Sequence, residues 1–361
     1  MALSARMVKR METNVNISVI DFFCGCGGTS AGLRLSGMNI VAGIDCDNVA
    51  LETYKRNFPE AKSLHADISE LTCAQLEESL GELARPLLLA ACAPCQPFSN
   101  QNRHKNSSDS RVVLLDELHD FVSYFRPEYV LLENVPGMQK VEEGPFLRFT
   151  EFLKNQGYEI DFGVKDAKDY GVPQSRRRLV LIASRLGSVS LPQQTHGESD
   201  DLIDYVTVND AIKSYPEIEA GQTNADIPNH QTAQISELNL NRLRHTPEGG
   251  DRRDWPEELL LECHKRKTGY TDTYGRLRGS EPAKTLTTKC ISISNGRFGH
   301  PCQDRALSVR EAASLQSFPD DFVFVGTLMQ TAKQVGNAVP VRFARALGQQ
   351  ISEHFRNSID G

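Results

Sequence analysis

Between residues 17 and 184 the sequence alternates short apolar runs with segments whose apolar residues recur at helical spacing. The expected strands are Ile17–Phe23, Ile40–Ile44, Leu87–Cys92, Tyr129–Leu132 and Leu179–Ala183. The expected helices between them are Thr29–Ser36, Asn48–Asn57, Arg111–Phe125 and Phe146–Gln156. Because strands that alternate with helices are usually joined by right-handed crossovers, this order predicts a doubly wound α/β domain with a parallel sheet.

The rest of the chain has a different character. Its 361 residues exceed the roughly 250–300 that one hydrophobic core usually serves. After about Ser188, Gly, Thr, Asn, Pro and charged residues dominate, and the next convincing helical patterns are Ser308–Gln316 and Val341–Phe355. We therefore expect a flexible tail over 1–15, one domain formed by 16–187 and 326–361, and a smaller, irregular second domain over 188–325.

The net charge of −7 argues by itself against a nucleic-acid partner, because phosphate binding needs clustered Lys and Arg. The distribution is uneven, however: from Lys265 to Arg310 there are ten Lys or Arg and only three acidic residues. A cationic face on an acidic body is therefore expected.

Composition also excludes some classes of protein. The longest apolar stretch, Leu87 to Ala93, is far shorter than the roughly 20 residues of a membrane-spanning helix, and the first 30 residues lack the apolar core of a signal peptide. The nine cysteines are an odd number scattered along the chain, which is not the pattern of a disulfide framework. We expect a soluble, cytosolic protein.

A glycine cluster follows the first expected strand, where open α/β sheets bind ligands. Gly25, Gly27 and Gly28 let the backbone approach a ligand closely, and Asp45 lies 20 residues beyond Gly25, the interval typical of an acid that binds a ribose. No phosphate-binding Gly-Lys-Ser/Thr follows, so the pattern favours an adenosine-containing ligand without phosphates. Asp67-Ile68 is a further candidate contact for adenine. The alternative is a tight turn that only packs the first helix.

Cys95 lies between Pro94 and Pro97, in a loop that leaves the carboxyl end of the third expected strand. The two prolines hold the loop in an irregular conformation, which makes Cys95 a better candidate nucleophile than Cys92 at the end of the strand. The alternatives are a Cys92–Cys95 redox pair or a metal site that also uses Cys24 and Cys26. The absence of a nearby His and of a following helix argues against both, and we expect no metal.

Glu133 ends the next expected strand, and neighbouring parallel strands end at the same edge of a sheet. It is therefore expected to face Cys95, where an apolar pocket would raise its pKa and let it share a proton with a ring nitrogen. Arg176 and Arg178 precede the last expected strand and point to the same side by alternation. Two guanidinium groups there suit a carbonyl oxygen, a phosphate or the Glu133 carboxylate. Without the neighbouring motifs, Glu133 would be equally consistent with a surface salt bridge.

Together these residues resemble the motifs of the cytosine-C5 DNA methyltransferases, bacterial in style, over almost the whole chain. Six segments match in order: Phe23–Gly28, Pro94–Gln96, Glu133–Val135, Gln174–Arg178, Arg305–Pro319 and Gln334–Pro340. The resemblance implies a Rossmann-like, S-adenosylmethionine-dependent methyltransferase domain with a target-recognition domain. It implies cofactor contacts at Phe23, Gly25, Gly27, Gly28, Asp45, Cys46, Asp67, Ile68, Pro94, Asn337 and Val339. Many relatives have Trp where this chain has Cys46, so adenine stacking is expected to differ.

The resemblance also implies the chemistry. The Cys95 thiolate would add to C6 of a flipped cytosine and make C5 nucleophilic; Glu133 would bind N3 and the exocyclic amine, and Arg176 O2, while Arg178 braces Glu133. Residues 99–110 would then form a lid over the base; the alternative is a plain surface loop. The residues expected to contact DNA are Ser99, Arg111, Gln174, Arg276, Arg278, Lys289 and Arg297.

The partner that follows from the resemblance is double-stranded DNA, with a cognate restriction endonuclease acting separately and the enzyme itself a monomer. Two other functions remain open at this point. One is methylation of cytosine in transfer RNA, which a related branch performs with the same motifs. The other is a catalytically silent DNA-binding regulator on the same fold, although Cys95, Glu133 and Arg176 argue against it.

Overall fold

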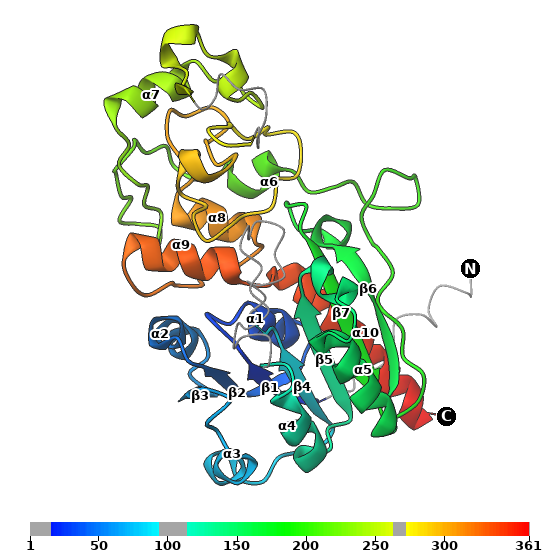
Figure 1. The fold of residues 1–361 in the computed structure, drawn as a ribbon. Helices are drawn as coiled ribbons and strands as arrows, with labels where there is room; N and C mark the ends of the chain where they lie inside the picture. The colour runs from blue at the N-terminus through cyan, green and yellow to red at the C-terminus, as the bar shows by residue number, and fades with distance from the viewer. Residues whose placement is uncertain (1–15, 94–113, 263–271, 361) are drawn as a thin grey trace, which may run out of the picture.

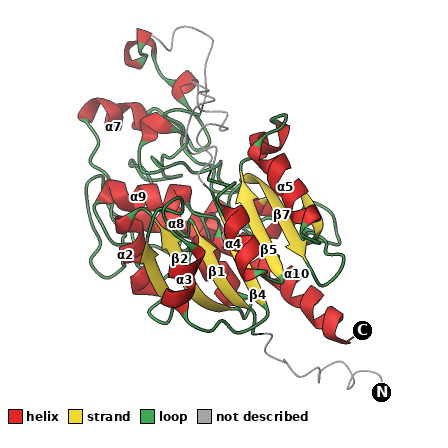
Figure 2. Cartoon of the chain, turned by 60° about the horizontal axis from the view of Figure 1, so that its bottom comes forward, coloured by secondary structure: helices red, strands yellow, loops and turns green. Residues whose placement is uncertain are grey.

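The computed structural model describes residues 16–93, 114–262 and 272–360. It shows a sheet domain and a second lobe that projects from one edge of it (Figures 1 and 2). The expected residues Pro94, Cys95, Ser99 and Arg111 lie outside the described residues.

The sheet has seven strands in the order β3-β2-β1-β4-β5-β7-β6. Their bounds are β1 Ser18–Phe22, β2 Asn39–Asp45, β3 Lys62–His65, β4 Leu87–Ala91, β5 Tyr129–Asn134, β6 Glu159–Asp166 and β7 Arg177–Ser184. The five strands from β3 to β5 are parallel, but β7 runs antiparallel to both β5 and β6. The prediction of a wholly parallel sheet was therefore wrong at β7, and β6 was missed. Residues 167–176 between β6 and β7 hold no crossover helix, so the two strands pair as antiparallel neighbours.

Helices cover both faces of the sheet, as a doubly wound fold requires. One apolar core joins the first face to α1 (Gly28–Leu35), α2 (Asn48–Asn57) and α10 (Val341–Asp360). A second core joins the other face to α3 (Cys73–Leu80), α4 (Leu118–Phe125) and α5 (Pro145–Asn155). Successive residues of β1 alternate between the two cores, with Val19 in the first and Ile20 in the second.

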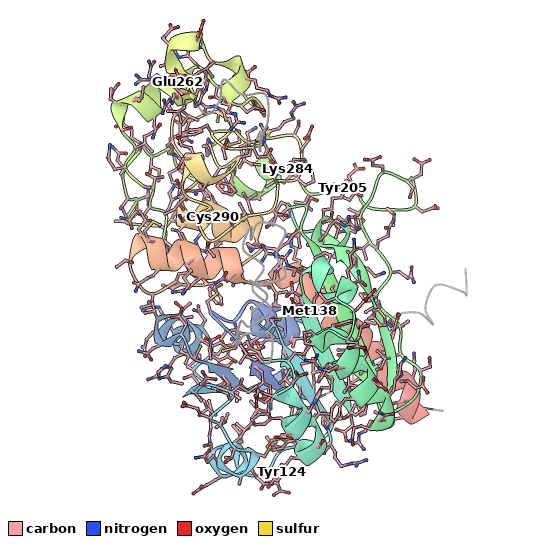
Figure 3. The ribbon with its side chains drawn as sticks, viewed as in Figure 1. Tyr124, Met138, Tyr205, Glu262, Lys284 and Cys290 are labelled. Atoms are coloured by element: carbon pink, nitrogen blue, oxygen red, sulfur yellow. The ribbon has the colours of Figure 1, made fainter. Side chains whose placement is uncertain are left out.

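The second lobe is largely irregular, as expected, but it contains the short helices α6 (Val208–Ile212) and α7 (Glu237–Arg244), which the sequence analysis missed. Nearer the sheet lie α8 (Val309–Leu315) and the unpredicted α9 (Leu328–Asn337). The described 3-10 helices are Pro136–Lys140, Ala167–Tyr170, Arg252–Asp254, Glu257–Leu259 and Ile293–Asn295. Lys284 and Cys290 lie on the side of this lobe that faces the sheet domain (Figure 3).

The first apolar core continues from the sheet into this lobe through residues such as Leu286, Phe298 and Val309. The separate core of the lobe contains only Leu243, Ile293 and Ala306 with two partly buried neighbours. Most of the described lobe is therefore stabilised by packing against the sheet domain.

Candidate active site

The glycine turn between β1 and α1 has the backbone geometry that the sequence predicts. Phe23, Gly25 and Gly27 have positive φ angles of 57°, 53° and 98°, of which only the last two belong to glycines. A left-handed conformation is strained for a bulky residue such as Phe23 and occurs mostly at functional turns. A Cβ on Gly25 would meet nothing within 4 Å, so the turn leaves open space on that side.

The first residue of α1 lies against a distant part of the chain. A Cβ on Gly28 would lie 2.4 Å from the carbonyl oxygen of Val339, so only glycine allows this approach. Val339 is buried, and Asn337 is exposed at the end of α9. The segment after α9 thus completes the wall of the glycine turn, as the resemblance implies.

Asp21 of β1 lies beneath the turn and is fully buried. Its Oδ2 accepts a hydrogen bond of 2.6 Å from the Ser30 hydroxyl, which also lies 3.1 Å from the Tyr54 hydroxyl. Burial raises the pKa of Asp21 to about 7, although hydrogen bonds from Ser30 oppose the shift. Asp21 was not predicted as a site residue, although a charged residue inside an apolar strand indicates a functional or structural role.

Asp45 lies at the carboxyl end of β2, next to the turn. Its Oδ2 accepts a hydrogen bond from the Gly25 amide and its Oδ1 one from the Asp47 amide, both 2.8 Å long. Burial raises the pKa of Asp45 despite these bonds. Each carboxylate oxygen has a second acceptor position, so the group can hold the turn and still accept from a ribose hydroxyl.

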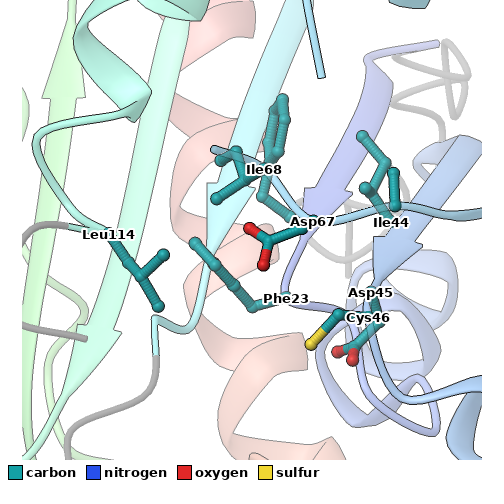
Figure 4. Close-up of a pocket in the computed structure, with 9 residues that line it drawn as sticks. Phe23, Ile44, Asp45, Cys46, Asp67, Ile68 and Leu114 are labelled. Carbon is teal, nitrogen blue, oxygen red and sulfur yellow. The ribbon is translucent and has the colours of Figure 1, made fainter. Parts of the chain in front are cut away.

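A pocket opens beside Asp45 at the carboxyl ends of β1, β2 and β3. It is lined by Phe22, Phe23, Ile44, Asp45, Cys46, Ala66, Asp67, Ile68 and Leu114. Figure 4 shows the side chains of Phe23, Cys46 and Asp67 turned toward the same space. Hydrogen bonds from Ser69 to Asp67 lower the pKa of that carboxyl, which favours its charged form. The pocket is an apolar slot with carboxylates at its rim, and it brings together Phe23, Asp45, Cys46, Asp67 and Ile68 of the predicted cofactor contacts.

Asn134 fixes the point where the expected catalytic loop begins. Its side-chain amide donates a hydrogen bond of 3.0 Å to the carbonyl of Ala93, the last described residue before that loop. Cys92 packs beside it, with Sγ 3.3 Å from the Thr29 hydroxyl. Burial raises the pKa of the Cys92 thiol well above its usual value, and the negative charge of Glu133 adds to the effect. Cys92 therefore stays a thiol.

Glu133 and Arg178 form an ion pair at the same edge of the sheet. The Nε of Arg178 lies 2.9 Å from Oε1 of Glu133, and the two side chains are only 14% and 10% exposed. Because β7 is antiparallel to β5, its first residues lie beside the last residues of β5, which brings Arg178 to Glu133. Arg177 is exposed, as the predicted alternation requires.

Arg176 and Gln174 are buried at the junction with the second lobe. The guanidinium of Arg176 donates to the carbonyls of Leu286 and Gly336, at 3.0 and 3.1 Å. The side chain of Gln174 bonds to the backbone of Leu286 and to Gln316. The prediction that Gln174 contacts DNA finds no support in this arrangement, because its side chain is fully buried.

Comparison with known proteins decides what this site belongs to. A family model described as C-5 cytosine-specific DNA methylase matches residues 17–353. The chain belongs to this methylase family. It is a DNA cytosine-5 methyltransferase.

Two relatives match the methylase along nearly their whole length. The Type II methylase M.HgiDII of Herpetosiphon aurantiacus is 37% identical over 351 residues, which are 95% of this chain and 96% of that protein. The Type II methyltransferase M1.HphI of Haemophilus parahaemolyticus is 32% identical over 341 residues, 93% of this chain and 87% of that protein.

Solved structures show the same fold. A structure described as a DNA modification methyltransferase encoded within a prophage (E. coli) superposes with a TM-score of 0.72 at 23% identity, covering 96% of this chain and 100% of that one. The Dnmt2 methyltransferase of S. pombe gives a TM-score of 0.65 at 19% identity, covering 95% of this chain and 99% of that one. The fold is therefore that of the S-adenosylmethionine-dependent, Rossmann-like methyltransferases.

The cationic segment of the methylase divides into buried and exposed side chains. Arg276 donates to four backbone carbonyls and pairs with Asp304 at 2.8 Å. Arg297 pairs with Asp251 and Asp272. These internal bonds give no support to the prediction that Arg276 and Arg297 contact DNA. The exposed cations of the described segment are Arg278, Lys284 and Lys289.

Two further observations concern the methylase within the described ranges. No group of three or more His, Cys, Asp or Glu side chains is placed to hold a metal ion, and Cys24 and Cys26 are buried, with pKa values raised by that burial. No described helix combines the length and apolarity needed to cross a membrane.

Proposed function

We propose that this methylase transfers a methyl group from S-adenosylmethionine to C5 of a cytosine in a specific duplex DNA sequence, through a covalent adduct of Cys95. The observation that carries the proposal is the arrangement at one sheet edge. There the apolar pocket with its carboxylate rim, the Glu133–Arg178 pair and the Ala93 carbonyl held by Asn134 lie at the ends of adjacent strands.

The cofactor would lie along the carboxyl ends of β1 to β3. Phe23, Cys46 and Ile68 offer apolar surface to adenine, while Asp45 accepts from the ribose and Asp67 from the adenine amino group. Gly25, Gly27 and Gly28 leave room for the methionine end, with Pro94, Asn337 and Val339 completing the site. When bound, the cofactor supplies an electrophilic methyl group.

Cys95 would make the cytosine ring reactive. Its thiolate would form a bond from Sγ to C6, and the electron pair of the C5=C6 bond would become available at C5, which would take the methyl group as S-adenosylhomocysteine leaves with the electrons of the broken S–C bond. Loss of the C5 proton to a water molecule then returns electrons to the ring and expels Sγ. Glu133, held by Arg178, would share a proton with N3 and accept a hydrogen bond from the exocyclic amine, which offsets the negative charge that builds on the ring. Arg176, which its bonds to the carbonyls of Leu286 and Gly336 hold in place, would donate a hydrogen bond to O2.

Substrate binding would use both parts of the molecule. C6 of a paired cytosine is inaccessible, so the base must leave the DNA helix and enter the site. Residues 99–110, which begin at Ser99 and lie outside the described residues, would form a lid over it. Residues 188–325 would act as the target-recognition domain on a catalytic domain of 16–187 and 326–361. Arg278 and Lys289, with Arg111, would contact the phosphates that position the DNA.

The biological setting is also a proposal. The named relatives are Type II methylases of bacteria, which supports a role in a restriction-modification system. We propose a monomeric enzyme of the bacterial cytoplasm whose cognate endonuclease acts separately.

The test is methyl transfer from labelled S-adenosylmethionine to duplex DNA or to transfer RNA. We expect label on DNA; label on transfer RNA alone would replace the proposed substrate, and label on neither would favour a silent regulator. Cys95→Ala is expected to abolish transfer while S-adenosylhomocysteine binding persists. Duplexes with 5-fluorocytosine should form an adduct that resists denaturation, because fluorine blocks loss of the C5 substituent. Undiminished turnover by Cys95→Ala would refute covalent catalysis.

A further inference from the structure

Gln316, just after α8, lies at the centre of a buried hydrogen-bond network. Its side chain is fully buried. Its amide nitrogen donates to the carbonyls of Val335 and Ala338, at 2.7 and 3.1 Å. Its amide oxygen accepts from the Gln174 amide at 2.9 Å. Both ends of one amide are therefore used by different parts of the chain.

On the cofactor side, this network holds the end of α9. The last carbonyls of a helix have no partner within the helix, and Gln316 and Arg176 supply donors to Val335, Gly336 and Ala338. The next residue, Val339, lies directly against Gly28 of the glycine turn. Gln316 thus fixes the segment that forms one wall of the proposed cofactor site.

On the other side, the network holds the second lobe through Leu286. The Gln174 amide oxygen accepts from the Leu286 amide at 2.8 Å, and Arg176 donates to the Leu286 carbonyl. Residues 174 and 283 form a parallel bridge beside this point. A Cβ on Gly336 would lie 2.2 Å from the Thr287 carbonyl oxygen, so α9 and this segment of the lobe are in direct contact.

We propose that Gln316 and Gln174 are positioning residues that couple cofactor binding to DNA binding. The proposal rests on the proposed function of the site. A shift of the segment that contacts the cofactor changes the partners of Gln316, and through Gln174 it changes the position of Leu286 in the DNA-binding lobe. By linkage, DNA then changes cofactor affinity by the same factor, which for coupled sites is about 5- to 150-fold.

The measurement is the dissociation constant of a specific duplex with and without saturating S-adenosylhomocysteine. In the wild type, the ratio of the two constants is the coupling factor. Gln316→Met and Gln174→Met keep the length of the side chain but remove its hydrogen bonds. We expect each variant to bring the coupling factor to within about twofold of 1. Because both residues belong to one chain of contacts, the double variant should lose no more coupling than either single variant.

The controls separate coupling from stability and from function. Gln349→Met, at an exposed position of α10, should leave the coupling factor unchanged. Both variants should keep the far-ultraviolet circular dichroism spectrum of the wild type and a cooperative unfolding transition, which a general loss of structure would not allow. If Gln316→Met does not fold, Gln174→Met carries the test, since it removes the bonds of residue 174 but leaves those of Gln316 to Val335 and Ala338 in place.

Folded variants that keep the wild-type coupling factor overturn the inference, as does a wild type in which S-adenosylhomocysteine leaves DNA affinity unchanged. Either result is compatible with methyl transfer to DNA. Absence of transfer by the wild type would instead refute the proposed function, so the two failures are distinguishable.

Discussion

Replacing Asp21 with Asn is expected to change the pH dependence of stability. The folded protein raises the pKa of this carboxyl from 3.8 to about 7, chiefly by burial. Between these values the folded state holds the proton more tightly than the unfolded state, so stability is lost as pH rises from about 4 to about 7. At 1.36 kcal/mol for each pH unit, the full loss above pH 7 is about 4 kcal/mol, of which about a third is already present at pH 5.

Asp21→Asn removes this titration. The Asn carbonyl can accept a hydrogen bond from Ser30. Its amide nitrogen would take the place of Oδ1, which has no hydrogen-bond partner. The buried N–H donors would then lack an acceptor, at a cost of about 1–3 kcal/mol. That cost does not depend on pH. The difference in unfolding free energy, variant minus wild type, should therefore rise by about 3 kcal/mol from pH 5 to pH 8.

Urea unfolding followed by far-ultraviolet circular dichroism at matched pH values measures this difference. Asp201→Asn, at an exposed loop position, is the control and should give a flat difference. The charged or ionisable groups that act on Asp21 include Asp45, Cys24, Cys26, Tyr54 and Cys92, none of which is basic. A flat difference for Asp21→Asn as well would refute the reasoning, because Asp21 would then titrate alike in both states.

Two further substitutions test the site. Gly28→Ala should weaken S-adenosylhomocysteine binding by about 10- to 100-fold in calorimetry, because the new Cβ would push Val339 away. Gly163→Ala is the control and should leave the binding unchanged, because its Cβ would lie 3.5 Å from its nearest neighbour. Unchanged binding by Gly28→Ala would contradict the placement of the cofactor. Glu133→Gln should slow single-turnover methyl transfer by about 100-fold or more, and it should lower the melting temperature because Arg178 loses its partner. A variant that is fully active would remove Glu133 from the mechanism.

The sequence predicted most of what depends on local pattern. The bounds of α2 are Asn48–Asn57 as predicted, because Asp47 caps its first amides and the apolar spacing is regular. β6 was missed although Ile160, Phe162 and Val164 alternate, since its residues are half exposed at the sheet edge and the pattern is weak. α9 was also missed, although Thr327 and Gln330 form a capping box that marks its start.

The antiparallel direction of β7 was not predicted from the sequence. The strand itself was predicted. A parallel β7, however, would have placed Arg178 at the other end of the strands, far from Glu133. The antiparallel direction is what lets a residue at the start of one strand meet a residue at the end of its neighbour.

Side-chain burial in the second lobe was beyond sequence reasoning. Exposed Arg278 and buried Arg276 are two residues apart and look alike in sequence. What distinguishes them is that carbonyls from two distant segments, residues 243–246 and 300–303, meet at Arg276, which only the folded chain reveals. A count of basic residues therefore overestimates the charge that can face DNA.

The contact between Gly28 and Val339 joins residues near opposite ends of the chain. During synthesis, the strands and glycine turn can emerge from the ribosome long before the residues that close against them. A nascent chain, or one cut short before residue 339, would carry the turn without its wall. Translation must therefore pass residue 339 before the glycine turn can be closed and the enzyme can work.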